Sequence, residues 1–110
     1  MQDKLKKLNY YIDKTIEVGN RRNMWYNYDK TNDNSIKIEL IKSKLMHIVT
    51  EVSEAYKELD KETYKNKDKF IEEMADVVLV TFGIIGKLEL KEEFINSIYD
   101  KIEKNLTRKD

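Results

Sequence analysis

The sequence predicts an all-α protein, folded as a four-helix antiparallel bundle in one domain that spans residues 1–110. Three observations predict this fold class. Proline is absent and glycine occurs only three times, while Lys, Glu, Ile and Leu are abundant, a composition that favours helix. Apolar residues recur at helical spacing in four segments. The connections between these segments are short, so consecutive helices are expected to be antiparallel neighbours.

Charge and composition exclude several classes of function. The chain has 21 basic and 21 acidic residues and no cysteine. A general nucleic-acid surface would need a basic excess, and a disulfide framework or thiolate metal site would need cysteine. No secretory signal precedes the first helix, and the longest mostly apolar run, Val77–Ile85, is too short to span a bilayer. We expect a soluble cytoplasmic protein without nucleic-acid or membrane partners.

The first helix is predicted from Asp3 to about Val18. Apolar residues recur along it at helical spacing, and Gly19-Asn20 is typical of a C-terminal stop. We expect this helix to be a packing element.

Residues 20–35 lose the helical period and are predicted to form a loop. The loop holds the only tryptophan, Trp25, close to Arg21 and Arg22. Aromatic faces stack on bases and arginines bind phosphates, so a nucleotide contact is one interpretation. The other is that Trp25 caps the core from the loop. Asp33–Ser35 supply possible N-caps for the next helix.

Two central helices are predicted at about Ile36–Leu59 (or Asp60) and Asp68–Leu88, joined by the charged connection Lys61–Lys67. Each has one apolar stripe. The stripes are Ile41, Leu45, Ile48, Val52, Ala55 and Leu59 on the first, and Phe70, Met74, Val77, Val80, Ile84 and Leu88 on the second. Facing stripes on a short connection predict an antiparallel helical hairpin.

Each central helix carries an acidic pair at spacing i, i+3: Glu51 with Glu54, and Glu73 with Asp76. Glu51 and Glu73 lie about 80° from their stripes, and Glu54 and Asp76 about 140° to the same rotational side. A turn centred near residues 63 and 64 would set Glu51 level with Asp76, and Glu54 level with Glu73. All four carboxylates are then expected to converge. The alternative is that each pair belongs to a solvated helix face.

Convergence would be costly without a cation. Two carboxylates ~6 Å apart repel by roughly 3 kcal/mol at an effective dielectric of about 20. A divalent cation removes this cost, so the acids predict a metal site. His47 lies four residues before Glu51 and could join the site, or it could be a surface or supporting residue.

The second central helix is apolar on its back as well, through Val78, Leu79 and Phe82. A helix that is apolar almost all round is buried on several sides, so we expect a second subunit to complete the bundle. A purely intramolecular bundle is the alternative. Gly83 and Gly86 are expected to mark close helix contact.

The last helix is predicted to start near Lys91 and to pack through Phe94, Ile95, Ile98, Ile102 and Leu106. Lys101, Lys104, Asn105 and Arg108 occupy one flank. With a turn near residues 89 and 90, this flank comes level with residues 73–76 and could face the acids, where basic groups suit a polyphosphate. Alternatively, these basic residues only complement the helix dipole.

These motifs resemble those of the MazG-like all-α nucleoside triphosphate pyrophosphohydrolases. The family signature is E-x-x-E on one helix and E-x-x-D, often written EExxD, on the next. Here they read EVSE, ending at Glu54, and EEMAD, from Glu72 to Asp76. The resemblance covers the two central helices and extends more weakly to Lys104, Asn105 and Arg108 and to the Trp25 loop.

The resemblance implies Mg²⁺-dependent cleavage between the α and β phosphates of a nucleoside triphosphate, with Mn²⁺ as a possible substitute. It implies Glu51, Glu54, Glu73 and Asp76 as the metal-binding and catalytic acids. It also implies substrate contacts from Trp25, near the base, and from Lys101 or Lys104, Asn105 and Arg108. The family is typically oligomeric, so a homodimer or homotetramer is expected.

Several alternatives stay open at this stage. The proton acceptor could be Glu51, Glu54, Glu72 or Glu73. A di-iron carboxylate bundle needs two Glu-x-x-His motifs, and one histidine largely excludes it. The main competitor is a non-catalytic helical dimer that regulates or binds a partner.

Overall fold

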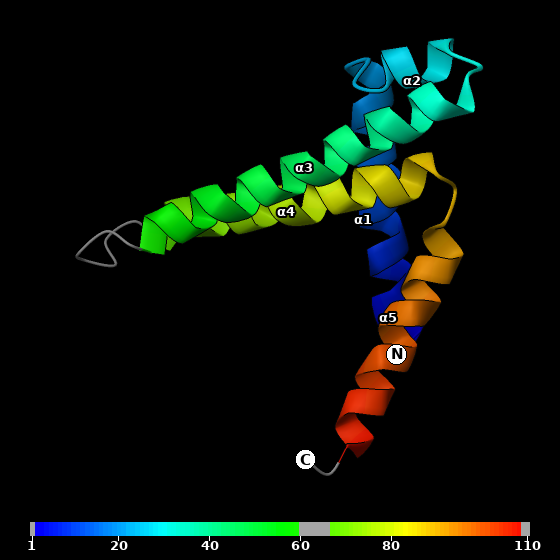
Figure 1. Cartoon of the computed structure of the whole chain (residues 1–110). Helices are drawn as coiled ribbons and strands as arrows, with labels where there is room; N and C mark the ends of the chain where they lie inside the picture. Colours follow the sequence, from blue (N-terminus) through cyan, green and yellow to red (C-terminus); the bar gives the residue numbers. More distant parts are fainter. Residues whose placement is uncertain (1, 60–66, 109–110) are drawn as a thin grey trace.

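The structure, a computed structural model, describes residues 2–59 and 67–108, with side chains from residue 6 onward. Its helices are α1 (Gln2–Arg21), α2 (Tyr26–Lys30), α3 (Asn34–Leu59), α4 (Lys67–Lys87) and α5 (Lys91–Thr107) (Figure 1). No strand occurs in these ranges, so the all-α prediction is confirmed. None of the helices described is long and apolar enough to cross a membrane.

Helices α3 and α4 form the predicted antiparallel hairpin. They run side by side (Figure 1) and make the most extensive helix contact in the protein. The predicted apolar stripes contribute buried residues to the fold, Ala55 on α3 and Ile84 on α4. The turn predicted near Thr63 and Tyr64 lies outside the described residues. This hairpin carries both acidic pairs.

Helix α1 crosses the hairpin steeply and packs mainly on α4 (Figure 1). Ile12 is fully buried. A Cβ atom added at Gly86 would lie 2.3 Å from Ile16 Cγ1, so glycine is what lets the two helices approach this closely. The prediction of close helix contact is therefore confirmed at Gly86. At Gly83 the nearest side-chain atom, Thr15 Cγ2, is 3.9 Å from such a Cβ.

The end of α1 differs from the prediction. The helix does not stop at Gly19-Asn20 but continues to Arg21. It ends in the two hydrogen bonds of a Schellman motif. The Met24 N–H donates to the Gly19 carbonyl at 3.0 Å, and the Asn23 N–H donates to the Asn20 carbonyl at 3.3 Å. Asn23 has a φ of 52°, a left-handed conformation that asparagine tolerates better than most residues. Gly19 instead packs against Trp25.

The predicted loop contains a short helix, α2, and ends at a capped α3. α2 is held to the end of α4 by an ion pair between Asp29 and Lys87. Asp33 caps α3: its Oδ1 accepts a hydrogen bond of 2.9 Å from the Ser35 N–H. The Ser35 hydroxyl donates to the same oxygen at 2.7 Å, and this hydrogen bond together with the one from the Ser35 N–H lowers the pKa of the Asp33 carboxyl. The prediction of an N-cap in this segment is confirmed.

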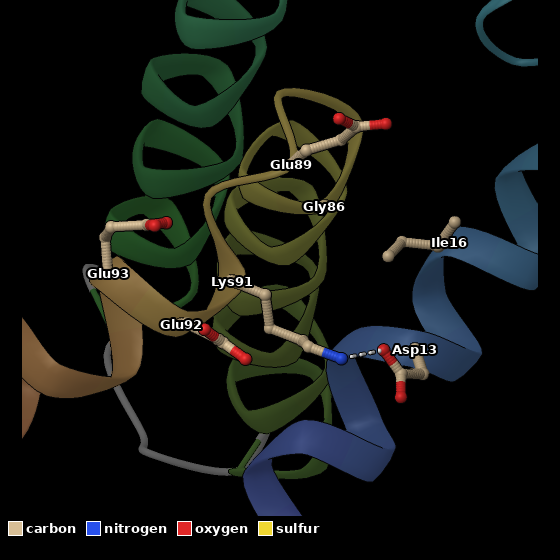
Figure 2. Close-up of a pocket in the computed structure, with 7 residues that line it drawn as sticks. All are labelled: Asp13, Ile16, Gly86, Glu89, Lys91, Glu92 and Glu93. Carbon is tan, nitrogen blue, oxygen red and sulfur yellow. Dashed lines mark hydrogen bonds and ion pairs between the residues drawn. The ribbon is translucent and has the colours of Figure 1, made fainter.

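The expectation that α5 lies along α4 is corrected. α4 ends in a Schellman-type turn. Glu89 is left-handed, with a φ of 58°, and the Leu90 N–H donates to the Ile85 carbonyl at 3.0 Å. Lys91 then pairs with Asp13 of α1 at 2.8 Å (Figure 2). Figure 1 shows α5 leading away from the hairpin beside α1. Turn and ion pair together steer α5 onto α1.

The single chain is therefore more open than a closed four-helix bundle. Its radius of gyration is 16.5 Å, against about 13 Å for a compact chain of 110 residues. Many large apolar side chains on the hairpin are exposed: Leu45, Met46, Val49, Val52 and Tyr56 on α3, and Ile71, Met74, Val78 and Leu79 on α4. We refer to these nine residues as the exposed hairpin face. Large apolar side chains that are exposed together on neighbouring helices are typical of association sites.

Candidate active site

Three carboxylates meet on the hairpin. Glu51 of α3 and Glu73 and Asp76 of α4 each offer an oxygen, and these oxygens all lie within 4.8 Å of one another. The Glu51 side chain is 17% exposed and that of Glu73 12%, whereas Asp76 lies open to solvent. We call these three residues the acidic cluster. Among the residues described, it is the only group of acids and histidine with this geometry.

The hairpin explains why these acids meet. Glu73 and Asp76 are three residues apart, so they are neighbours on α4. Antiparallel packing brings Glu51 against both of them. The prediction that Glu51 comes close to Asp76 is confirmed.

Glu54 does not join the cluster. Its side chain is 48% exposed, and its Oε1 lies 3.6 Å from Lys57 Nζ on the same helix. Asp76 has the same rotational offset of about 140° and stays in the cluster, so the difference lies in the rotamer of Glu54, which brings it to Lys57 on the solvent side. The expected convergence of four carboxylates is thus corrected to three.

Burial from water and the neighbouring carboxylates determine how the acids of the cluster titrate. The pKa of Glu73 is raised, first by burial and then by a hydrogen bond to the Glu51 carboxylate that only the protonated form can donate. Lys69, whose Nζ is 3.5 Å from Glu73 Oε1, opposes this rise and does not cancel it. A cation bound between these three acids would relieve the repulsion among their carboxylates and lower the pKa of Glu73 again.

His47 supports the cluster from α3. Its Nε2 lies 2.9 Å from Glu51 Oε1, and with Nε2–H as donor this hydrogen bond fixes one carboxylate oxygen of Glu51. The remaining oxygen stays available to the cluster. His47 is therefore not one of the clustered groups itself, and it contacts the cluster through Glu51.

A pocket opens beside the cluster, in the angle between α1 and the hairpin. Its volume is about 500 Å³, and Glu51 and Asp76 form part of its wall. Cationic and aromatic side chains line it as well: Lys14 from α1, Arg22 from the turn after α1, Lys44 and His47 from α3, and Trp25. A volume of this size is in the range of small-molecule sites.

Trp25 combines the two roles that the sequence left open. It is 9% exposed and meets the Tyr28 ring edge to face at 5.6 Å between centroids, so it belongs to the core. It also lines the pocket, and Lys44 Nζ lies 5.1 Å from its ring centroid. Its remaining free surface therefore faces the pocket.

The basic flank of α5 does not reach this site. Lys101, Lys104, Asn105 and Arg108 are all exposed, and no residue of α5 lines the pocket. Figure 1 shows their part of α5 at the far end from the hairpin. The prediction that this basic flank lies level with residues 73–76 and faces the acids is therefore wrong within one chain.

Sequence reasoning missed Lys14 and Lys44 as pocket residues. Lys44, His47 and Glu51 are spaced i, i+3, i+7, which places them on one face of α3. This spacing was a usable signal for Lys44. Nothing in the sequence predicted Lys14, because its position depends on how steeply α1 crosses the hairpin.

A second, smaller pocket of about 280 Å³ lies where α1, α4 and α5 meet. Asp13, Glu89, Glu92 and Glu93 surround it, with Lys91 paired to Asp13 (Figure 2). Figure 2 shows these acids spread around the junction rather than pointing to one centre. We assign it no function.

No protein-family model, curated protein or solved structure matches this chain.

Proposed function

We propose that this chain is a Mg²⁺-dependent nucleoside triphosphate pyrophosphohydrolase that releases the nucleoside monophosphate and pyrophosphate. The observation that carries the proposal is the acidic cluster on the wall of a pocket that also holds cationic and aromatic side chains. Acids for a cation, cations for phosphate and an aromatic ring for a base are the groups such a substrate needs. The bond cleaved follows from the resemblance of EVSE and EEMAD to the MazG-like enzymes.

The donor set of the cluster fits magnesium. Mg²⁺ is a hard cation that takes oxygen ligands and is commonly held by a few carboxylates together with substrate phosphates. Glu51, Glu73 and Asp76 offer only oxygen, and the spread of their oxygens leaves room for an ion among them. When bound, Mg²⁺ or Mn²⁺ would neutralise phosphate charge and lower the pKa of an attacking water.

Two roles remain for the protein's own side chains: holding the acids in position and accepting the proton of the attacking water. His47 holds Glu51 in place through the 2.9 Å hydrogen bond. Glu54 and Glu72 are both largely exposed and paired with lysines, Lys57 and Lys69. Of the four glutamates that could accept the proton of water, this leaves Glu51 and Glu73 as the better placed.

An oligomer is part of the proposal. The exposed hairpin face supports association of chains as a homodimer or homotetramer, because burying it would remove a large apolar area from water. No residue of α5 lines the pocket of its own chain, so the proposal gives Lys101, Lys104, Asn105 and Arg108 no substrate contact there.

The same face supports a second candidate function, a non-catalytic helical dimer that regulates or binds a partner. That function needs the exposed apolar residues and makes no use of the cluster. The two candidates differ in what an acid substitution does.

The test is a panel of ribo- and deoxyribonucleoside triphosphates incubated with Mg²⁺ or Mn²⁺, with products separated by chromatography. We expect monophosphate and pyrophosphate from the wild type, and a loss of at least about 100-fold in rate for Asp76→Asn. Glu72→Gln, an exposed acid on the same helix, is the matched control and should keep its activity. Orthophosphate with nucleoside diphosphate as the products would contradict the proposal, and absence of turnover on the whole panel would favour the non-catalytic dimer.

A further inference from the structure

We infer that the phosphate groups of the ligand are held by Arg22, in the turn after α1, and Lys44 of α3, with Lys14 of α1 beside them, and not by the basic end of α5. The inference rests on the proposed function for the nature of the ligand, a polyphosphate bound with a divalent cation. It assigns the pocket a complete set of anion contacts within one chain.

Charge balance requires cations in this pocket. Three carboxylates and one divalent cation leave a net charge of about minus one in the cluster. A polyphosphate is itself strongly negative, so it would be repelled unless other positive groups lie near. Lys14, Arg22 and Lys44 are the lysine and arginine residues that line the pocket.

Lys44 is placed to reach a ligand that also touches the cluster. It shares one face of α3 with His47 and Glu51, and it lies two helical turns from Glu51, roughly 10 Å along the axis. Its ammonium group rests 5.1 Å from the Trp25 ring centroid. This contact holds the charge at the pocket wall without neutralising it.

Arg22 and Lys44 differ from their neighbours in lacking an acidic partner. Arg21 pairs with Glu17 at 2.7 Å, and Lys42 pairs with Glu39 at 3.4 Å. Within residues 2–59 and 67–108, neither Arg22 nor Lys44 forms an ion pair. Lys14 is paired with Glu17, so we expect it to contribute less. Arg22 and Lys44 both line the pocket next to the acidic cluster, and no carboxylate in the described part of the chain already neutralises either of them.

Trp25 offers a direct report of binding. It is the only tryptophan in the chain and it lines the same pocket as Arg22 and Lys44. A phosphate group drawn to Lys44 would change the charge facing the indole. The emission of Trp25 should therefore respond to an anion that carries no base.

The experiment titrates inorganic triphosphate into the full chain with excess Mg²⁺ and follows Trp25 emission. The variants are Arg22→Gln and Lys44→Gln, with Arg21→Gln and Lys42→Gln as matched controls. Lys44→Arg keeps the charge, and Lys104→Gln and Arg108→Gln test α5. Circular dichroism checks that each variant keeps its helices.

We expect saturable binding to the wild type and a rise in Kd of about tenfold for Arg22→Gln and for Lys44→Gln, since each loses a charge-assisted hydrogen bond. Lys44→Arg, both matched controls and both α5 variants should stay within about twofold of the wild type. The inference is overturned if the wild type does not bind, if Arg22→Gln and Lys44→Gln bind like the wild type, or if the α5 variants weaken binding more.

Hydrolysis of nucleoside triphosphates by the same preparation separates the two proposals. Binding with the expected pattern but no hydrolysis would remove the enzyme and leave the phosphate contacts. Hydrolysis to monophosphate and pyrophosphate without that pattern would keep the enzyme and overturn the assignment of Arg22 and Lys44.

Discussion

Single side chains decide what the site can be. Glu51, Glu73 and Asp76 meet because of their positions on a hairpin, whereas Glu54, one turn from Glu51, turns to solvent and pairs with Lys57. The pairing of acids across the hairpin could be predicted from their spacing and their side of each helix. The departure of Glu54 could not, because a helix-wheel angle does not say which rotamer a partly exposed glutamate adopts.

The raised pKa of Glu73 predicts a pH dependence of stability. A carboxyl group whose folded pKa lies above its unfolded value, near 4.5, binds its proton more tightly in the folded state. Its contribution to stability is therefore fully present below the unfolded pKa and is lost as the pH rises through the folded pKa. In the absence of divalent cations, Glu73→Gln should be more stable than the wild type at pH 7.

Urea unfolding of the cation-free protein between pH 4 and pH 8 measures this effect. The difference in unfolding free energy between Glu73→Gln and the wild type should grow as the pH rises, while Glu72→Gln should show no such trend. A difference that is constant over this range would mean that Glu73 titrates normally.

Helices and turns were predictable to different degrees. α3, α4 and the start of α5 follow from apolar periodicity, and their bounds lie within two residues of the predicted ones. α1 was predicted to stop at Gly19-Asn20 but continues to Arg21, and the left-handed residue that follows it is Asn23. The direction of α5 depends on a left-handed Glu89, where glycine is the usual residue, and on the long-range pair of Lys91 with Asp13. Neither feature leaves a periodic signal in the sequence.

The crossing of α1 over α4 makes a prediction for two glycines. Alanine at 86 places a Cβ 2.3 Å and 2.5 Å from Cγ1 and Cδ1 of Ile16, so either the Ile16 side chain must leave its rotamer or the helices must move apart. Overpacking of this kind costs about 1–3 kcal/mol, more than the gain of about 1 kcal/mol in helix propensity. We expect Gly86→Ala to destabilise the protein by up to about 2 kcal/mol.

Gly83→Ala is the matched control, because its Cβ would lie 3.9 Å from Thr15 Cγ2. It should be neutral or stabilising by up to about 1 kcal/mol. Chemical denaturation of both variants tests the pair. If Gly86→Ala were as stable as Gly83→Ala, the close packing of α1 on α4 would not exist in solution.

At the scale of the whole molecule, the fold leaves an open angle between α1 and the hairpin and an uncovered apolar surface on the hairpin, and Leu79 belongs to both. The angle between α1 and the hairpin forms the pocket. The exposed hairpin face includes Val78 and Leu79 on the back of α4, which the sequence already identified as apolar. The predicted closed bundle did not include this wide angle between α1 and the hairpin. Periodicity indicates which face of each helix is apolar, but it does not give the angle at which two helices cross.

The exposed hairpin face predicts self-association. Val78 is 45% exposed, and a charge placed there would oppose burial against a second chain. We expect the wild type to sediment as a dimer or larger, and Val78→Glu to shift toward the monomer with its helix content unchanged. Ser43→Glu adds the same charge to an exposed polar position of α3 and should not alter the mass. A monomeric wild type at micromolar concentration would remove the oligomer from the account.

The most direct test of the central claim is a titration with Mn²⁺ followed by the relaxation of water protons, which reports a protein-bound ion without any substrate. We predict saturable Mn²⁺ binding to the wild type, weakened at least about tenfold by Asp76→Asn and retained in Glu54→Gln, since Glu54 lies outside the cluster. Mn²⁺ binding that is absent in the wild type, or indifferent to Asp76→Asn, would contradict the claim that these three carboxylates form a cation site.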